Sequence, residues 1–144
     1  MILFVCTGNT CRSPLASVFM QERIKEAGLN LIVESAGIYG YNGQAASSGS
    51  INAANSHGLS LSYHKAQNIM DVKGIENALI LTMTNAHKEY IQSMKLGKEI
   101  YTLYEYTQNK RQDIKDPFGS DDETYLQCAE EIKELINMIN MENF

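Results

Sequence analysis

The most informative segment of the chain is Ile2-Leu3-Phe4-Val5-Cys6-Thr7-Gly8-Asn9-Thr10-Cys11-Arg12-Ser13-Pro14. Its apolar beginning predicts a buried strand, and the short loop after Cys6 leads into a second apolar run at residues 15–20. Ser13 is a preferred N-cap residue, and Pro14 suits the first helical turn because its missing N–H would be unpaired there. The segment therefore predicts a strand, a tight loop and a helix, in that order.

The loop is expected to bind an oxyanion. A helix N-terminus presents unpaired N–H groups and the positive end of the helix dipole. Gly8 and Asn9 both tolerate left-handed backbone angles, which would let successive amides turn inward around an anion. The predicted phosphate-binding residues are Thr7, Gly8, Asn9, Thr10, Cys11 and Arg12.

Cys6 is the candidate nucleophile. It ends the strand and faces the loop amides and Arg12, and both stabilise a thiolate over a thiol. Such a thiolate can attack a bound phosphorus, while the planar guanidinium of Arg12 donates to two equatorial oxygens. The alternative is an inert core cysteine, but packing alone does not explain a Gly-Asn loop that leads into Arg-Ser-Pro. The segment thus predicts phosphatase chemistry without a metal.

Composition limits the other possibilities. The 144 residues, 44% of them hydrophobic, suit one domain spanning residues 1–144. A net charge of −5 gives no broad attraction for nucleic acid or anionic membranes. The chain has no apolar run long enough for a membrane span, and Met1 leads straight into the first strand without the features of a signal peptide. We expect a monomeric, cytoplasmic protein.

The chain also lacks the patterns of common metal and nucleotide sites. Its three cysteines, Cys6, Cys11 and Cys128, form no disulfide framework, and no histidine stands at zinc-finger spacing from them. The Gly-Lys-Ser/Thr pattern that binds nucleotide phosphates is absent after Gly8. We therefore predict neither a metal nor a cofactor.

Beyond the first loop, predicted strands and helices alternate. The first helix is expected to end near Ala27, because Gly28 follows. Apolar and β-branched runs predict strands at residues 31–35, 77–82 and 99–103. Helices are predicted at residues 50–57, 66–70 and 85–94, with a last helix that begins at a capping box over residues 120–123. The alternation predicts an α/β fold, a three-layer sandwich with a central four-stranded parallel sheet flanked by helices.

Two stretches are predicted to lack regular structure. Residues 36–48 are rich in Gly, Ala and Ser and should form a loop beside the site. One of its two tyrosines, Tyr39 or Tyr41, is expected to wall the substrate pocket, although exposed tyrosines are common in loops. Residues 104–115 are polar and irregular and lead into an Asp-Pro-Phe-Gly turn, which places Asp116 on a loop.

The pattern Cys-x5-Arg-Ser-Pro near the N-terminus, with Asp116-Pro117-Phe118 downstream, resembles the low-molecular-weight protein tyrosine phosphatase family. The resemblance runs along the whole chain. It implies that Cys6 is the nucleophile, that Arg12 binds phosphate, and that Asp116 is first the general acid and then the base that activates water. Without the Cys6 loop, Asp116 would be an ordinary Asp-Pro turn. The hydrogen-bonded support implied for the loop consists of Asn9, Ser13, Ser35 and His64.

Thr10 decides the predicted substrate. Tyrosine-directed members of the family usually carry an aliphatic residue at this position, whereas the protein-arginine phosphatase branch carries Thr within the string Cys-Thr-Gly-Asn-Thr-Cys-Arg-Ser-Pro found here. A hydroxyl can hydrogen-bond a guanidinium nitrogen, and Asp116 can accept from it too. Phe118 is expected to line the same pocket. We predict a phosphatase of phosphoarginine in phosphorylated proteins, with phosphotyrosine as the alternative substrate.

Other functions fit the residues less well. An arsenate reductase would need further cysteines near the loop, whereas Cys128 lies in the predicted last helix. A phosphate-binding module without turnover would need neither a nucleophile nor an acid. Cys6 and Cys11 are five residues apart in a loop that curls back, so we expect a redox switch in which Cys11 resolves oxidised Cys6. The alternative is that Cys11 only packs beneath the loop.

Overall fold

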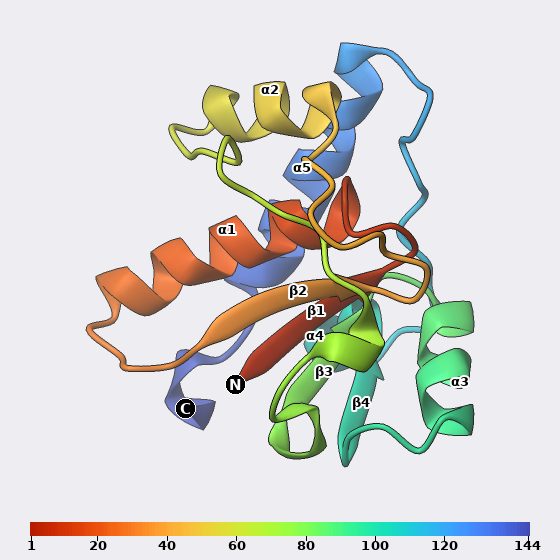
Figure 1. Ribbon diagram of the computed structural model, residues 1–144. Coiled ribbons are helices and arrows are strands. Elements are labelled where there is room, and N and C mark those ends of the chain that lie inside the picture. The colour runs from red at the N-terminus through yellow and green to blue at the C-terminus, as the bar shows by residue number, and fades with distance from the viewer.

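Four parallel strands form the central sheet of the computed structural model, which describes residues 1–144 (Figure 1). The strands are β1 (Ile2–Cys6), β2 (Val33–Gly37), β3 (Leu79–Thr82) and β4 (Glu99–Thr102), in the order β2-β1-β3-β4. From β1 the chain moves outward to β2 and then returns to β3 on the opposite side of β1. Ligands of open parallel sheets bind beyond the carboxyl ends of the strands at such a reversal. For this chain that place is the loop after Cys6.

Five helices flank the sheet. They are α1 (Arg12–Glu26), α2 (Ser48–Ser56), α3 (Asn85–Ser93), α4 (Leu103–Gln108) and α5 (Asp122–Asn137). Three short 3-10 turns complete the chain, η1 (Ile69–Asp71), η2 (Ile75–Asn77) and η3 (Met141–Asn143). None of these elements has the length and apolar character that crossing a bilayer requires.

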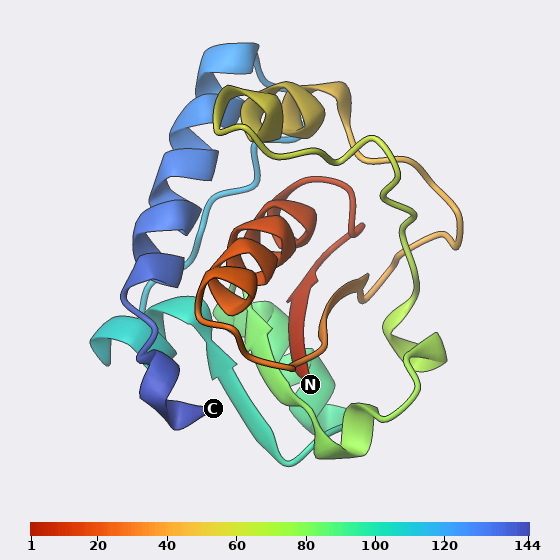
Figure 2. The same cartoon turned by 90° about the vertical axis from the view of Figure 1, so that its left-hand side faces the viewer.

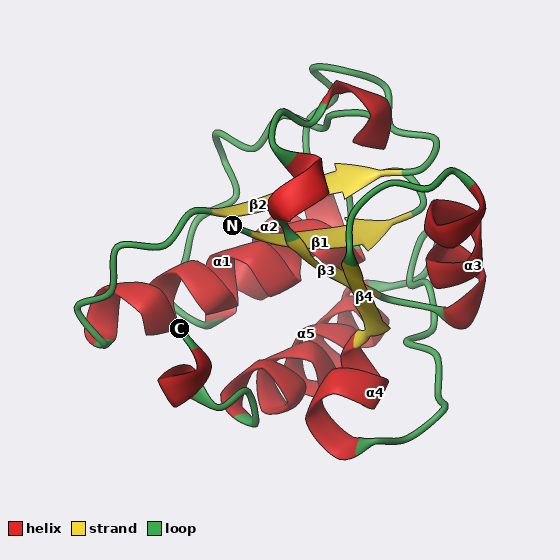
Figure 3. Cartoon of the chain, turned by 90° about the horizontal axis from the view of Figure 1, so that it is seen from below, coloured by secondary structure: helices red, strands yellow, loops and turns green.

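The two faces of the sheet are covered separately, because successive side chains of β1 point to opposite faces. Phe4 packs in one cluster with Leu15 of α1 and Ile132 of α5, whereas Leu3 packs in the other with Ile91 of α3. All five side chains are fully buried, and each burial stabilises the fold by roughly 1.5–3 kcal/mol. Figure 3 shows α1 and α5 together on one side of the sheet. The α/β three-layer sandwich with a four-stranded parallel sheet is confirmed.

Helix α2 lies outside this sandwich. It packs against α5 and against the N-terminal end of α1, away from the sheet (Figure 2). The predicted helix at residues 50–57 matches it to within two residues. The helix predicted at residues 66–70 is instead the short turn η1 at residues 69–71. The second strand begins at Val33 rather than at residue 31 and ends at Gly37.

The predicted irregular stretch 104–115 is wrong at its beginning, where α4 forms. The reason is a capping box across the end of β4: Thr102 Oγ1 accepts the Glu105 N–H at 3.0 Å, and Glu105 Oε1 accepts the Thr102 N–H at 2.9 Å. The last helix also begins later than expected. Asp121, rather than Ser120, caps α5, because its Oδ1 accepts the Thr124 N–H at 2.9 Å.

Candidate active site

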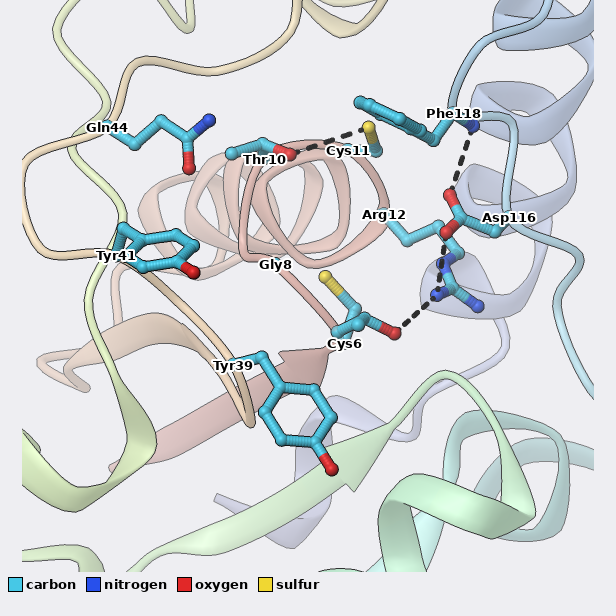
Figure 4. A pocket seen from close by; sticks show the side chains of 11 residues that line it. Cys6, Gly8, Thr10, Cys11, Arg12, Tyr39, Tyr41, Gln44, Asp116 and Phe118 are labelled. Atoms are coloured by element: carbon cyan, nitrogen blue, oxygen red, sulfur yellow. Dashed lines mark hydrogen bonds and ion pairs between the residues drawn. The ribbon is translucent and has the colours of Figure 1, made fainter.

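A pocket of about 240 Å³ opens beyond the carboxyl end of β1, where the strand order reverses (Figure 4). It is bounded by the loop after β1, by the loop after β2 and by the turn before α5. The lining residues are Cys6, Thr7, Gly8, Thr10, Cys11, Arg12, Tyr39, Tyr41, Gln44, Asp116 and Phe118. The structure therefore brings both ends of the sequence motif, more than a hundred residues apart, to one cavity.

The Cys6 sulfur lies at the end of β1 and is almost fully buried. Its Sγ is 2.9 Å from the hydroxyl oxygen of Ser13. The prediction that Ser13 caps the helix is wrong, since α1 begins at Arg12 and no side chain caps it. The Ser13 hydroxyl is instead held inside the loop, where it can donate to a Cys6 thiolate, and such a hydrogen bond favours the charged form.

Asn9 holds the loop together from within. It is fully buried, and its φ of 58° is the left-handed conformation predicted for it. Its side-chain amide donates to Ser13 Oγ at 2.9 Å and to Ser35 Oγ at 2.8 Å, and its Oδ1 accepts the Gln67 N–H at 3.0 Å. His64 Nε2 lies 2.7 Å from the Asn9 carbonyl oxygen. The four residues proposed as support for the loop are thus joined in one network, to which sequence reasoning had not added Gln67.

Gly8 does not adopt the left-handed conformation predicted for it; in this loop only Asn9 has a positive φ. A side chain at Gly8 would meet only the Thr10 hydroxyl, at 3.7 Å. The glycine that the loop requires is Gly37, at the end of β2. A Cβ there would stand 2.6 Å from the Thr7 carbonyl oxygen, so the loop packs directly on the backbone of β2.

Arg12 is buried and fixed on several sides. Its Nη1 donates to the Ile114 carbonyl at 2.8 Å, its Nη2 donates to Thr7 Oγ1 at 3.3 Å, and Nη2 also lies 3.6 Å from Asp116 Oδ2. Its Nε is buried and has no partner. A buried, unpaired N–H of a guanidinium calls for an acceptor, and an anion in the adjoining pocket would supply it.

Asp116 stands at the mouth of the pocket with its side chain 47% exposed. Its Oδ1 accepts the Phe118 N–H at 3.1 Å, which fixes the Asp-Pro-Phe turn. Aromatic side chains form the rim: Phe118, Tyr39 and Tyr41 are all largely exposed and all line the pocket. The sequence predicted that one of the two tyrosines lines the pocket, whereas in the structure both of them do.

The other two cysteines differ in their surroundings. Cys11 Sγ donates to Ser47 Oγ at 3.3 Å and lies 3.5 Å from Tyr125 Oη, at the pocket wall. Cys128 faces the Lys115 carbonyl from α5, and burial raises the pKa of its thiol to about 12. Cys128 is therefore a protonated, unreactive thiol at neutral pH. No three His, Cys, Asp or Glu side chains are grouped as ligands for a metal ion.

Sequence reasoning missed His87, on α3. Its Nε2 lies 2.9 Å from Thr7 Oγ1, the oxygen that also accepts from Arg12. Burial, and next the positive charge of Arg12, lower the pKa of His87 to about 4. Nothing in the local sequence marks this residue, because it reaches the loop from 80 positions away.

The fold and the pocket define an α/β protein with a candidate oxyanion-binding loop between its first strand and its first helix. A sequence model described as low molecular weight phosphotyrosine protein phosphatase matches residues 1–142, and the chain belongs to this family. It is a phosphatase of a family that acts on phosphorylated proteins.

Characterised relatives fall into two groups. The protein-arginine-phosphatase of Bacillus subtilis is 33% identical over 141 residues, covering 96% of this chain and 93% of its own. The low molecular weight protein-tyrosine-phosphatase PtpB of Staphylococcus aureus is 38% identical over 136 residues, covering 94% and 93%. Identity to these relatives therefore does not separate the two substrates.

Solved structures show the same division. A YwlE arginine phosphatase mutant with a phosphorylated active-site serine aligns with a TM-score of 0.89 at 34% identity, covering 95% of this chain and 91% of its own. A low molecular weight protein tyrosine phosphatase from T. tengcongensis aligns with a TM-score of 0.83 at 34% identity, covering 95% of both chains.

Proposed function

We propose that this phosphatase hydrolyses phosphoarginine in proteins through a phosphocysteine intermediate on Cys6. The observation that carries the proposal is the set of groups around one pocket: the Cys6 sulfur, the guanidinium of Arg12 with its unpaired Nε, the Asp116 carboxylate and the Thr10 hydroxyl. A nucleophile, an anion-binding cation and an acid-base group are what a two-step phosphoryl transfer needs.

In the first step the Cys6 thiolate attacks phosphorus. The new S–P bond forms as the P–N bond to the arginine side chain breaks, and the Asp116 carboxylic acid donates its proton to the leaving nitrogen. Arg12 Nε and the loop amides donate to the equatorial oxygens and stabilise the charge that these oxygens carry. The fixed position of Arg12 means that no reorganisation is needed at that moment.

In the second step water attacks the phosphocysteine. The Asp116 carboxylate takes a proton from that water, the S–P bond breaks, and inorganic phosphate and the Cys6 thiolate are released. The Ser13 hydroxyl, 2.9 Å from the sulfur, stabilises the departing thiolate. The phosphorylated active-site serine in the structure of the YwlE mutant supports a covalent phosphoryl-enzyme for this fold.

Thr10 favours arginine as the substrate. It lines the pocket, and its hydroxyl has only a long contact with Cys11 Sγ, at 3.7 Å, so it is free to accept from a guanidinium N–H. An aliphatic side chain in its place would present an apolar wall to a phenyl ring. The B. subtilis relative named as a protein-arginine-phosphatase supports the same reading.

Phosphotyrosine is the second candidate substrate. The aromatic rim of Tyr39, Tyr41 and Phe118 could stack on a phenyl ring as well as on a guanidinium plane. The relatives named as tyrosine phosphatases support this alternative. The two substrates would use the same nucleophile, acid and phosphate loop, and differ only in contacts beyond the phosphoryl group.

A direct comparison tests the function. Wild-type protein in the presence of a metal chelator should hydrolyse a chromogenic aryl phosphate, and Cys6→Ser should not, because an alcohol is a far poorer nucleophile than a thiolate. Cys128→Ser, which removes a sulfur outside the pocket, is the matched control and should keep its activity. The value of kcat/KM should be higher for phosphoarginine than for phosphotyrosine. The reverse order would establish the alternative, and an inactive wild type would refute both.

The pocket also supports reversible control by oxidation. Cys6 and Cys11 are both free and both line the pocket. A peroxide would convert the Cys6 thiolate to a sulfenic acid, and the Cys11 thiolate would then attack that sulfur, forming a disulfide and releasing hydroxide. Cys11 would have to leave its hydrogen bond to Ser47 to do so. The disulfide would block the nucleophile until a thiol reduced it.

A further inference from the structure

One side-chain oxygen in the pocket is held from two directions. Thr7 Oγ1 lies 2.9 Å from His87 Nε2 and 3.3 Å from Arg12 Nη2. His87 is 4% exposed, and its other ring nitrogen, Nδ1, is buried and has no hydrogen-bond partner. Thr7 lines the pocket, whereas His87 does not. The hydrogen bond that joins the imidazole to the loop after β1 is therefore the one to Thr7.

The ring is neutral at pH 7. Burial is the main reason that its pKa falls to about 4, and the charge of Arg12 acts in the same direction, while Asp113 and Asp116 oppose it. A neutral imidazole carries one hydrogen, on Nδ1 or on Nε2. A hydrogen on Nδ1 would be a buried N–H without an acceptor, which is rarer in proteins than an acceptor without a donor. The surroundings thus favour the tautomer with its hydrogen on Nε2.

In that tautomer the Thr7 oxygen accepts two N–H groups, one from His87 and one from Arg12. A hydroxyl oxygen has two acceptor positions, so both are occupied. Its own hydrogen must then be donated elsewhere, and the side of Thr7 left open is the pocket. We propose that His87 is a positioning residue that, together with Arg12, directs the Thr7 hydroxyl hydrogen onto an oxygen of the bound phosphoryl group.

This inference rests on the proposed function, because it assigns Thr7 to the phosphoryl group of the substrate. It adds a side-chain donor to a loop that otherwise binds through backbone amides and one arginine. Whether the Thr7 hydroxyl donates to the phosphate depends on the tautomer of His87. If the ring hydrogen were on Nδ1, the Thr7 hydroxyl would donate to His87 Nε2 and not to the phosphate. The inference is therefore decided by a property of the free protein and by the coupling between two side chains.

A double-mutant cycle measures that coupling. His87→Phe keeps a flat ring and removes the donor, and Thr7→Val keeps the branched shape and removes the hydroxyl. His87→Phe should lower kcat/KM for an aryl phosphate and weaken inhibition by inorganic phosphate, each by roughly tenfold, the size expected for a hydrogen bond to a charged group. In the Thr7→Val background the same change should cost less than about twofold, because the hydroxyl that His87 positions is already gone. An equal cost in both backgrounds would overturn the proposal.

Helix stability needs its own control, because His87 lies in the first turn of α3. Thr84 caps this helix by accepting the His87 backbone N–H at 3.1 Å and has no hydrogen bond to Thr7. Thr84→Val should lower the melting temperature and leave kcat/KM nearly unchanged. A loss of activity equal to that of His87→Phe would mean that α3 matters only as a support.

Nitrogen NMR of the wild-type imidazole completes the test without any variant. The ¹⁵N shifts and long-range couplings should report a hydrogen on Nε2 at pH 7, with and without inorganic phosphate. A hydrogen on Nδ1 in both states would overturn the inference even if the enzyme is active. An inactive wild type with the Nε2–H tautomer would refute the phosphatase function instead, so the two failures are distinguishable.

Discussion

The Ser13 hydroxyl oxygen lies 2.9 Å from the Cys6 sulfur, and both side chains are buried. Ser13 is also an acceptor for the Asn9 amide, which fixes its position in the loop. With one acceptor position used by Asn9, the Ser13 hydrogen is free to be donated to the sulfur. A serine in the first turn of α1 therefore lies within hydrogen-bond distance of the Cys6 sulfur, and the helix has no side-chain cap.

Replacing Ser13 by Ala should slow the breakdown of the phosphocysteine more than its formation. The departing thiolate would lose a hydrogen bond worth roughly 1.5–3 kcal/mol to a charged acceptor, so kcat should fall by about tenfold or more. Rapid-mixing kinetics with an activated aryl phosphate should then show a burst larger than that of the wild type.

The matched control is Ser35→Ala. It removes the other acceptor of the Asn9 amide without touching Cys6. If Ser35→Ala lowers kcat as much as Ser13→Ala does, Ser13 acts only by holding Asn9 in place.

Asp116→Asn should reveal a general acid through the leaving group. Without a proton donor, the loss of kcat/KM should be greatest for phosphate esters of weakly acidic phenols and smallest for activated aryl phosphates. The slope of log kcat/KM against leaving-group pKa measures this. Asp113→Asn removes a neighbouring carboxylate that accepts the Asn85 N–H and should leave the slope as it is. A uniform loss across leaving groups would show that Asp116 only positions the substrate.

Cys11→Ser should convert reversible oxidation into permanent loss. Peroxide should inactivate the wild type, and a thiol reductant should restore it, because the Cys6–Cys11 disulfide protects the sulfur from further oxidation. In Cys11→Ser the sulfenic acid should proceed to sulfinic acid, and the activity should not return. Cys128→Ser should behave as the wild type. Mass spectrometry of the peroxide-treated protein that finds no linked Cys6 and Cys11 peptides would contradict the switch.

Stability should rise with pH across the range in which His87 titrates. Its pKa falls from 6.5 to about 4 on folding, so the unfolded chain binds more protons between these values. The free energy of unfolding should therefore increase by on the order of 3 kcal/mol from pH 4 to pH 6.5. His64 has a pKa lowered by burial and adds to the same trend.

His87→Phe should flatten this pH dependence, leaving the part that comes from other groups with lowered pKa values, such as His64 and Glu105. Denaturant unfolding at several pH values between 4 and 7 measures the difference between the two proteins. Parallel curves for wild type and His87→Phe would mean that the buried ring has an ordinary pKa, and the argument for its neutral state would fail.

Local patterns predicted the elements that are continuous in sequence. The strand, the loop and α1 follow from neighbouring residues, and so does the parallel sheet. Predictions from local patterns were wrong where a residue makes a tertiary contact in place of the local contact that its type favours. Serine is a residue type that often caps helices, yet the Ser13 hydroxyl accepts from the Asn9 amide and lies against the Cys6 sulfur instead. The capping box of α4, formed by Thr102 and Glu105, can be found in the sequence. The helix was nevertheless not predicted, because it has only six residues and the sequence around and after it is polar.

The rest of the site depends on contacts that no local pattern reports. Gly37 is fixed by the approach of the loop backbone, and Arg12 is held by the Ile114 carbonyl. His87 reaches Thr7 from another helix. These contacts can be recognised only once the strand order is known, because that order places the ends of β1, β2 and β3 side by side.

Thr10→Ile should shift the substrate preference from phosphoarginine toward phosphotyrosine. Both side chains are β-branched, so the loop backbone should be preserved while one hydroxyl is lost and apolar surface is gained. A polar group left unpaired against a phenyl ring costs about 1–3 kcal/mol, which the substitution removes. If even about 1.4 kcal/mol is redistributed, the ratio of the two kcat/KM values changes by roughly tenfold.

Thr10→Val separates the two parts of that change, because it removes the hydroxyl and adds no further methylene. If the hydroxyl binds the guanidinium, Thr10→Val should lose most of the kcat/KM for phosphoarginine that Thr10→Ile loses. The gain on phosphotyrosine should then be larger in Thr10→Ile, since only that variant extends the apolar wall toward the ring. Equal activities of all three proteins on both substrates would remove the reason for preferring arginine, because the proposed preference depends on the Thr10 hydroxyl.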